Sequence, residues 1–499
     1  MLFHDIFAHH LKEREAIIDQ DRSVTYGEFQ DLVERWAAYF EALGVKKGDR
    51  VGLVSKNCLE FIVTYFAVIK AGGVIVPINF QLVPREIAYI VKDTAMKLLV
   101  VKEALPLAEP LQELSAPSLM QITFDELHHA PEQEFVPVSL TETDPSTIIY
   151  TSGTTGKPKG AMLSHGNLYA NARDFMESIP LTAEDTALCV LPMYHCFAWT
   201  VCVAGPLLCG GRIVIQAVYQ FKAAMRLVKQ YGVTMFTGVP AVYRLLHESR
   251  DLDSVDSVRY FISGGAPLGL DLARGFALKF GRPVLEGYGL SEASPVVSVN
   301  LPHKVKVGSI GPTIAHVKAK IINAHGEEVP HFERGELLVK GPNVMLGYLN
   351  LPDATAKAIE KDGWLHTGDV GYMDEDGFIF LVDRVKDMII SSGENVYPRE
   401  IEEVVSAYPG VAECSVIGIP DALRGQAICL YVVPREGETI DKKALRQYLI
   451  GRIAPYKVPR EYFLVESLPK TALGKVRKNV LRDETVAILS KNKFAGRAL

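Results

Sequence analysis

Short apolar runs of β type alternate with helical patterns through the first 380 residues. Two of these runs, Val51–Ser55 and Val74–Pro77, have the length and composition of buried strands. Between them, Leu59–Lys70 places aromatic and aliphatic side chains at helical spacing. This strand–helix–strand order predicts a mostly parallel α/β layer.

The pattern changes after about Val382. Two segments of helical pattern, Glu400–Tyr408 and Asp441–Ile453, flank two segments of strand pattern, Glu413–Ile419 and Ala427–Val433. Together they form a unit of about 115 residues, which is large enough to fold by itself.

The charged stretch Asp383–Asp387 separates the two regions. We therefore predict an α/β protein with a large, multi-subdomain N-terminal α/β domain over residues 1–384 and a small C-terminal α+β domain over residues 385–499. A short charged junction is a reasonable hinge between them.

The most apolar region of the chain is Ala187–Ile215. Residues that interrupt a membrane-spanning helix occur throughout it: Pro192, His195, Pro206, Gly210, Gly211 and Arg212. The region therefore predicts buried core strands and not a membrane span.

Composition narrows the class of protein. The chain has 499 residues, 48% of them apolar, and a net charge of −6, which gives no support to nucleic-acid binding. The N-terminus, MLFHDIFAHHLKERE, has charged residues before any long apolar run and is not a secretory signal. Seven cysteines without a CxxC pair favour structural thiols in a reducing cytoplasm.

A glycine-rich loop follows the apolar strand Ile148–Tyr150. The loop runs through Thr151, Ser152, Gly153, Thr154, Thr155, Gly156, Lys157, Pro158, Lys159 and Gly160. Its glycines allow the backbone close to an anion, its amides and hydroxyls can surround phosphate oxygens, and its lysines add positive charge. It is not a Walker A loop, because only two residues separate Gly153 from Gly156 and a proline follows Lys157. The alternative is a surface hairpin.

The sequence YTSGTTGKPKG resembles the signature loop of the adenylate-forming superfamily, which comprises acyl-CoA synthetases, adenylation domains and beetle luciferases. Further motifs of that family follow in the same order over almost the whole chain, which looks most similar to bacterial long-chain fatty acid–CoA ligases. The resemblance implies the adenylate-forming enzyme fold, with a mobile C-terminal domain, and implies that Thr151–Lys157 bind ATP and AMP.

Two later segments resemble the adenine site of the family. They contain Gly265, Ala266 and Pro267 in the first segment, and Gly287, Tyr288 and Gly289 in the second. The resemblance implies that the first segment and the ring of Tyr288 sandwich the adenine, a role that suits an aromatic side chain. Ser291 replaces a threonine common in the family, and Glu292 resembles the carboxylate that holds Mg²⁺, a cation that prefers oxygen ligands.

The resemblance assigns further nucleotide contacts after residue 364. Asp369, in WLHTGD, would bind both ribose hydroxyls, and Arg384 would reach the ribose and the phosphates. Lys386 matches the hinge position of the family. Segments 335–338 and 341–347 also fit a family motif, and we interpret them as scaffold.

Lys475 resembles the family lysine that enters the active site when the acid is adenylated. A carboxylate must approach an anionic α-phosphate, and an ammonium group relieves that repulsion. In the second step, the resemblance implies that the C-terminal domain rotates and that Gly393 leaves room for a pantetheine arm. Catalytic roles are thus expected for Lys475, His195 and Glu292. The presence of Lys475, Glu292 and Asp369 argues against a catalytically silent binding protein.

The acid substrate is predicted from the segment 191–199, which matches the family segment at the acyl pocket. The resemblance places His195 beside the reacting carboxylate, and Phe197, Trp199 and Val239 suggest an apolar pocket. Residues 192–220 include no Asp or Glu to pair with the ammonium group of an amino acid. We therefore predict a medium- to long-chain fatty acid, with ATP, Mg²⁺ and coenzyme A.

Three alternatives stay open within the superfamily: an aryl-acid CoA ligase, a ligase that charges a carrier protein, and a luciferase-like oxygenase. The expected partners are the fatty acid and CoA, without nucleic acid. The sequence leaves open a peripheral membrane contact and a homodimer.

Overall fold

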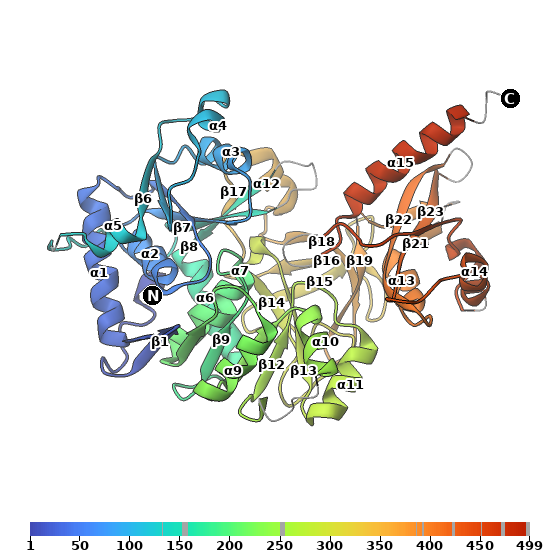
Figure 1. Cartoon of the computed structure of the whole chain (residues 1–499), viewed down its shortest axis with the longest axis horizontal. Helices are drawn as coiled ribbons and strands as arrows, with labels where there is room; N and C mark the ends of the chain where they lie inside the picture. Colours follow the sequence, from blue (N-terminus) through green and yellow to red (C-terminus); the bar gives the residue numbers. More distant parts are fainter. Residues whose placement is uncertain are drawn as a thin grey trace. The chain divides into compact units, whose positions relative to one another are not determined.

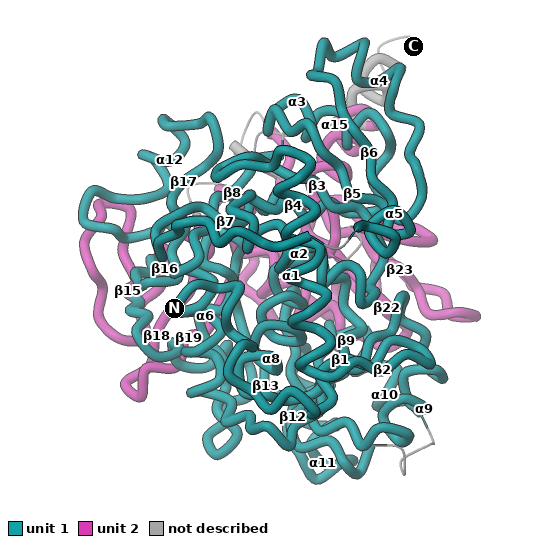
Figure 2. Tube along the Cα trace, turned by 90° about the vertical axis from the view of Figure 1, so that its left-hand side faces the viewer, with its two compact units in different colours: residues 1–319, 338–366 teal, residues 320–337, 367–499 magenta. Residues whose placement is uncertain are grey.

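The computed structural model describes residues 1–131, 133–151, 158–249, 255–385, 387–391, 394–421, 425–450, 452–470 and 475–495. The chain divides into two compact units, which Figure 2 colours separately. Unit 1 comprises residues 1–319 and 338–366, and unit 2 comprises residues 320–337 and 367–499. The domain boundary that we predict between residues 384 and 385 stays a prediction, as does the hinge at Lys386.

An eight-stranded, mostly parallel sheet forms one layer of unit 1. Its edge strands β2 and β14 pair antiparallel with their neighbours, whereas the strands between them pair in parallel. In sheet order the strands are β14 (Val296–Val299), β13 (Val284–Gly289), β12 (Tyr260–Ser263), β11 (Met235–Gly238), β9 (Thr186–Cys189), β10 (Arg212–Ile215), β1 (Glu15–Asp19) and β2 (Arg22–Thr25).

A seven-stranded sheet forms a second layer of unit 1. In sheet order its strands are β17 (Gly347–Tyr348), β8 (Lys159–Ser164), β7 (Pro145–Thr151), β4 (Val74–Ile78), β3 (Arg50–Val54), β5 (Leu98–Val101) and β6 (Met120–Thr123). Every residue of β4 and β5 is buried, which explains why their sequences are continuous apolar runs and not alternating ones. The predicted strand–helix–strand unit thus corresponds to β3, α2 and β4.

Two helices of unit 1 contact strands of both sheets. These are α2 (Leu59–Lys70), which contacts β1, β3 and β4, and α6 (His165–Ser178), which contacts β8 and β14. The position of α2 between two layers explains why it is apolar on nearly all sides. Helices α9, α10 and α11 cover strands of the eight-stranded sheet (Figure 1).

The other helices of unit 1 are α1 (Tyr26–Ala42), α3 (Pro84–Thr94), α4 (Ala108–Glu113), α5 (Phe124–His128), α7 (Cys196–Ala198), α8 (Gly205–Cys209), α9 (Phe221–Tyr231), α10 (Pro240–Glu248), α11 (Leu270–Phe280) and α12 (Pro352–Ala358). Short 3₁₀ turns occur at Phe3–Asp5 and Ser291–Ala293, and a π-helix at Trp199–Ala204.

The prediction that Ala187–Ile215 forms core strands is only partly right. Strands β9 and β10 occupy its two ends, but α7, the π-helix and α8 occupy its middle. All six residues of the π-helix are buried. A continuous apolar run has the same pattern in a buried helix and in a buried strand, so the pattern could not distinguish them.

Unit 2 contains most of a four-stranded sheet and all of a five-stranded one. The first consists of β15 (Lys318–Ile322), β16 (Gly335–Lys340), β18 (Leu365–Met373) and β19 (Ile379–Arg384). The second consists of β21 (Glu394–Val396), β20 (Ile389–Ser391), β23 (Gly425–Pro434), β22 (Val411–Asp421) and β24 (Glu461–Leu464). The helices of this unit are α13 (Pro398–Ser406), α14 (Lys442–Ile450) and α15 (Lys478–Ala495), with a 3₁₀ turn at Pro455–Lys457.

All seven cysteines fall within the described residues, and each is a free thiol. Among those same residues, no helix has both the length and the apolar content that crossing a bilayer would require.

Candidate active site

The glycine-rich loop joins the adjacent antiparallel strands β7 and β8. Thr151 is the last residue of β7, and it pairs with Lys159, the first residue of β8. The other loop residues predicted to bind phosphate, Ser152, Gly153, Thr154, Thr155, Gly156 and Lys157, lie outside the described residues.

The two predicted adenine segments follow neighbouring parallel strands. Strand β12 ends at Ser263, which pairs with Glu286 in β13. The turn after β12 contains Gly265, Ala266 and Pro267, and Gly265 has a φ of +78°, which favours glycine. The carboxyl ends of adjacent parallel strands meet at one edge of a sheet, so the turn lies next to the end of β13.

A buried carboxylate ties these two segments together. Glu286 Oε1 accepts a hydrogen bond of 2.9 Å from the backbone N–H of Leu268, at the end of the turn. Beyond Glu286, Gly287, Tyr288 and Gly289 complete β13, and Tyr288 pairs with Ser298 of β14. A Cβ at Gly289 would lie 2.1 Å from the carbonyl oxygen of Pro295, so a side chain does not fit there.

Glu292 lies in the 3₁₀ turn that directly follows this strand. Its Oε1 accepts a hydrogen bond of 2.8 Å from the hydroxyl of Tyr348. Its backbone carbonyl accepts one of 2.9 Å from the N–H of Met345. The carboxylate and backbone of Glu292 are therefore both held by the segment around β17.

Ser291 connects this turn to the segment predicted to border the acyl pocket. Its hydroxyl oxygen lies 3.3 Å from the sulfur of Cys196. The structure thus brings His195, the neighbour of Cys196, into the same part of unit 1 as Ser291 and Glu292.

His195 caps the N-terminus of α7. Its Nδ1 accepts a hydrogen bond of 3.2 Å from the N–H of Phe197, which puts the proton of the neutral ring on Nε2. Burial lowers the pKa of His195 to about 4, so the ring is neutral near pH 7. A neutral Nε2–H can donate a hydrogen bond to an acid without adding a charge.

Three residues are predicted to line an acyl pocket, and two of them border the turn that is predicted to bind adenine. A Cβ at Gly264 would lie 2.9 Å from the ring of Phe197, and one at Gly265 would lie 3.8 Å from Val239. The third residue, Trp199, is only 2% exposed, and its ring stacks on Tyr65 of α2 at a centroid distance of 3.7 Å. Trp199 is therefore part of the core beside α2.

In unit 2, Asp369 and Arg384 face each other on the antiparallel strands β18 and β19. The Nε of Arg384 lies 3.0 Å from Oδ1 of the buried Asp369. The N–H of Asp369 donates to the hydroxyl of Thr367, which in turn donates to the carbonyl of Leu337. The two predicted ribose contacts thus form an ion pair with each other.

Lys475 is exposed, three residues before α15 begins at Lys478. Two ion pairs fix this helix within unit 2: Lys478 with Glu402 at 2.9 Å and Arg482 with Asp387 at 2.7 Å. The predicted hinge, Lys386, and the predicted thiol-tunnel residue, Gly393, lie outside the described residues.

A separate group of potential metal ligands lies on α6 and near β15. Single ligand atoms of Asp174, Glu177 and His316 all lie within 4.8 Å of one another. However, the guanidinium of Arg173 donates to Asp174 at 2.7 Å and lies 3.1 Å from the ring nitrogen of His316. A cation already occupies this group, so we assign no metal to it.

Two residues of this region were not predicted from the sequence as site residues. Tyr348 lies just after the segment 341–347 that we interpret as scaffold, and Glu286 lies just before the predicted adenine segment 287–289. The signal for Tyr348 is its position directly after that motif. The sequence carries no corresponding signal for Glu286.

Comparison with known proteins identifies the family. The family model described as AMP-binding enzyme matches residues 5–349, and the model described as AMP-binding enzyme C-terminal domain matches residues 400–475.

Two curated relatives align over nearly their full length. A feruloyl-CoA synthase of Amycolatopsis sp is 38% identical over 465 residues, covering 92% of this chain and 94% of the relative. A long-chain-fatty-acid–CoA ligase of Bacillus subtilis (strain 168) is 33% identical over 518 residues, covering 95% of this chain and 92% of the relative.

Two solved structures are similar to this chain over nearly its whole length. ATP-bound MatB from Rhodopseudomonas palustris has a TM-score of 0.91 and 32% identity, covering 97% of this chain and 99% of that one. The o-succinylbenzoate coenzyme A synthetase MenE from Bacillus subtilis, in complex with ATP and a magnesium ion, has a TM-score of 0.87 and 30% identity, covering 96% and 98%. The chain therefore belongs to the AMP-binding, adenylate-forming enzymes, has their α/β fold with a large N-terminal and a small C-terminal domain, and is an ATP-dependent acid–thiol ligase that forms AMP and acyl-CoA.

Proposed function

We propose that this ligase activates a carboxylic acid with an uncharged, apolar acyl chain and transfers the acyl group to coenzyme A. The preferred substrate is a medium- to long-chain fatty acid. The proposal rests on which charged side chains the segment 192–220 contains and on how they are paired. It contains no Asp or Glu, and its one arginine, Arg212, is engaged elsewhere. Arg212 donates to Glu15 at 2.7 Å and to the carbonyl of Tyr231 at 2.8 Å.

The lack of acidic residues and the pairing of Arg212 disfavour two other classes of acid. An amino acid would bury its ammonium group without a carboxylate, and a dicarboxylic acid would bury its second carboxylate without a cation. An unpaired buried charge costs several kcal/mol. An apolar acyl group bordered by Phe197 and Val239 carries neither cost.

Roles in ATP binding are assigned to residues in each unit separately. In unit 1 we assign the phosphates to Thr151–Lys157, the adenine to Gly265–Pro267 and Gly287–Gly289, and a further contact with ATP and AMP to Ser291. In unit 2 we assign the ribose and phosphate side to Asp369 and Arg384. The ion pair of Asp369 with Arg384 supports this assignment, since a carboxylate that is already held in place loses less freedom when it binds two hydroxyl groups.

Glu292 is assigned to Mg²⁺. The donor set fits: a carboxylate oxygen is a hard ligand, and the hydrogen bond from Tyr348 holds this carboxylate in one orientation. When bound with ATP, the ion would offset the negative charge of the phosphates.

The proposed reaction has two steps. A carboxylate oxygen of the acid attacks the α-phosphorus, the bond from that phosphorus to pyrophosphate breaks, and acyl-AMP forms. His195 donates from Nε2 to the acid, and Lys475 offsets the charge that gathers on the phosphate. The CoA thiolate then attacks the acyl carbonyl and AMP leaves, with Lys386 as the hinge of the C-terminal domain and Gly393 beside the pantetheine arm.

A panel of acids tests the proposed substrate class. Thioester formation with ATP, Mg²⁺ and CoA is measured for octanoate, palmitate, ferulate, malonate and alanine. We expect kcat/KM for at least one fatty acid to exceed the values for malonate and alanine by about 100-fold or more, the effect of roughly 3 kcal/mol. Malonate or alanine as the best substrate would contradict the proposal.

A pair of variants tests the pocket itself. Val239→Phe narrows the proposed pocket and should lower kcat/KM for palmitate more than for octanoate. Val83→Phe is the matched control, because Val83 is 56% exposed at the start of α3. Equal effects of the two substitutions on both acids would show that Val239 does not line the pocket.

An aryl acid is the second candidate. Trp199, on which the long-chain prediction partly rests, is stacked in the core on Tyr65, and the feruloyl-CoA synthase relative is 38% identical. Ferulate as the best acid of the panel would favour this candidate over the fatty acid.

A further inference from the structure

Tyr348 holds the carboxylate that we assign to Mg²⁺. Its hydroxyl donates to Glu292 Oε1 at 2.8 Å, although the two residues are 56 positions apart in the chain. Hydrogen bonds to a charged acceptor are about twice as strong as neutral ones and fix its orientation. The carboxylate of Glu292 is therefore oriented by a residue that directly follows the segment 341–347, which we interpret as scaffold.

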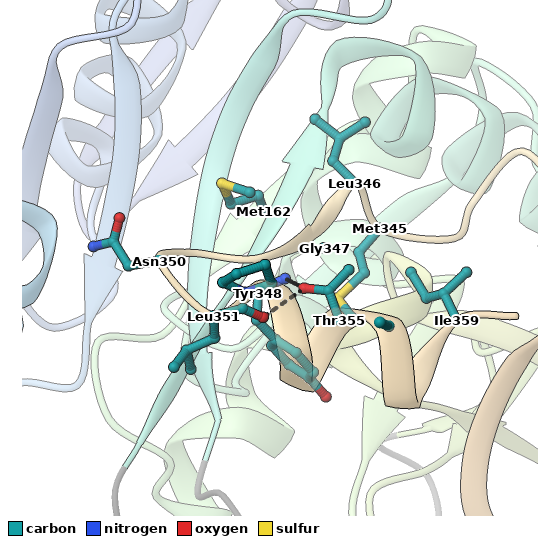
Figure 3. Close-up of a pocket in the computed structure, with 11 residues that line it drawn as sticks. Met162, Met345, Leu346, Gly347, Tyr348, Asn350, Leu351, Thr355 and Ile359 are labelled. Atoms are coloured by element: carbon teal, nitrogen blue, oxygen red, sulfur yellow. Dashed lines mark hydrogen bonds between the residues drawn. The ribbon is translucent and has the colours of Figure 1, made fainter. Parts of the chain in front are cut away.

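The backbone around Tyr348 is fixed on both sides. Strand β17 pairs with β8, so that Tyr348 lies opposite Ala161, and the N–H of Leu349 donates to the carbonyl of Gly160 at 2.8 Å. The N–H of Tyr348 donates to the hydroxyl of Thr355 at 2.9 Å, at the start of α12 (Figure 3). This frame gives the side chain little freedom to move away from Glu292.

The ring of Tyr348 also contacts the strand that continues from the glycine-rich loop. The ammonium of Lys159 lies over the ring, 5.0 Å from its centre. Tyr348 lines a cavity of about 610 Å³ together with Met162 and Leu346, and Figure 3 shows its ring pointing away from these two side chains. A cation over the ring is attracted to its face. One side chain thus connects the first residue of β8 to Glu292.

We propose that Tyr348 is a positioning residue for the binding of ATP with Mg²⁺: it orients Glu292 toward the ion and holds Lys159 at the end of the phosphate loop. The inference rests on the proposed role of Glu292 in metal binding. It assigns to Tyr348 the function of an outer partner that fixes a metal-binding carboxylate, without contact between Tyr348 and the substrates.

The proposal predicts a change in nucleotide binding that depends on the metal. Removal of such an outer partner commonly weakens metal affinity 10–100-fold. Tyr348→Phe removes the hydroxyl and keeps the ring under Lys159. We expect it to raise the Kd of ATP about 10-fold or more in excess Mg²⁺, measured by calorimetric titration without the acid, and to leave the Kd of ATP in EDTA unchanged.

Tyr26→Phe is the matched control. It removes a buried tyrosine hydroxyl of the same unit, which donates to the carbonyl of Gly211 at 2.7 Å. This variant should bind ATP like the parent protein with and without Mg²⁺. An equal loss of affinity in both tyrosine variants would overturn the proposal, because it would reveal a general effect on unit 1.

Glu292→Gln separates the inference from the function on which it rests. If Glu292→Gln binds ATP in Mg²⁺ like the parent, the role proposed for Glu292 is wrong. If Glu292→Gln loses affinity and Tyr348→Phe does not, only the inference about Tyr348 is wrong.

The double variant provides a readout that a general loss of stability would not mimic. If Tyr348 acts through Glu292, the Tyr348→Phe and Glu292→Gln double variant should bind ATP with Mg²⁺ no more weakly than Glu292→Gln alone. Losses that multiply in the double variant would show independent actions and contradict the proposal.

Discussion

Burial lowers the pKa of three histidines of unit 1, His4, His165 and His195, to about 4. In an unfolded chain, a histidine has a pKa near 6.5. The folded protein therefore holds these rings neutral at pH values where the unfolded chain binds protons. For His195, this property suits a group that donates a hydrogen bond to an acid near neutral pH.

The same property makes unit 1 sensitive to acid. As pH falls from about 6.5 toward 4, the unfolded chain takes up protons that the folded chain excludes, so stability falls. Each such histidine contributes up to about 1.4 kcal/mol per pH unit. We expect His165→Asn to reduce the drop in unfolding temperature between pH 7.0 and pH 5.5 by about 2 °C relative to the parent, by calorimetry.

His9→Asn serves as the control, because His9 is exposed. It should keep the pH dependence of the parent protein. If the unfolding temperature of His165→Asn falls between pH 7.0 and pH 5.5 by as much as that of the parent, burial of His165 does not contribute to the acid sensitivity.

At the scale of elements, the proposed adenine site depends on how two parallel strands end. Strands β12 and β13 lie side by side, and the turn after β12 is tied to β13 by a single buried carboxylate, Glu286. Loss of this contact would leave the N–H of Leu268 without its partner and free the turn. The position of Pro267 and its neighbours thus depends on a residue that does not belong to the turn.

Substitution of Glu286 should therefore act on ATP more than on the acid. We expect Glu286→Ala to raise the KM for ATP about 10-fold, because hydrogen bonds to charged groups contribute roughly 1.5–3 kcal/mol. Glu286→Gln keeps an acceptor oxygen and should raise this KM much less. Steady-state kinetics with each substrate varied in turn would measure both KM values. A rise in the KM for the acid alone would contradict the role of Glu286 in holding the turn after β12.

Elements with a clear pattern were predicted well from the sequence. Leu59–Lys70 is α2 at the same bounds, and Glu413–Ile419 and Ala427–Val433 lie inside the paired strands β22 and β23. In these segments, the local pattern and the tertiary contacts favour the same structure.

Contacts between distant segments could not be predicted in this way. The hydrogen bond from Tyr348 to Glu292 joins residues 56 positions apart, and it forms only because β17 adds to the edge of β8. Likewise, the stack of Trp199 on Tyr65 depends on α2 packing against the π-helix. Motif order predicts which residues carry the chemistry, but not which side chains hold those residues in place.

At the scale of the whole molecule, the candidate groups belong to two compact units. Thr151, Tyr288 and Glu292 are in unit 1, whereas Asp369 and Lys475 are in unit 2. The family models likewise match two separate parts of the chain, residues 5–349 and 400–475. The proposed reaction connects these groups: a carboxylate oxygen of the acid attacks the α-phosphorus of ATP, and that oxygen leaves with AMP.

Transfer of ¹⁸O tests this claim most directly. The purified protein converts a fatty acid labelled in both carboxylate oxygens, with ATP, Mg²⁺ and CoA, and the products are analysed by mass spectrometry. Attack on the α-phosphorus followed by thiolysis predicts one ¹⁸O atom in AMP and none in pyrophosphate, with the other retained in the thioester carbonyl. Label in inorganic phosphate, or AMP without label, would contradict the account.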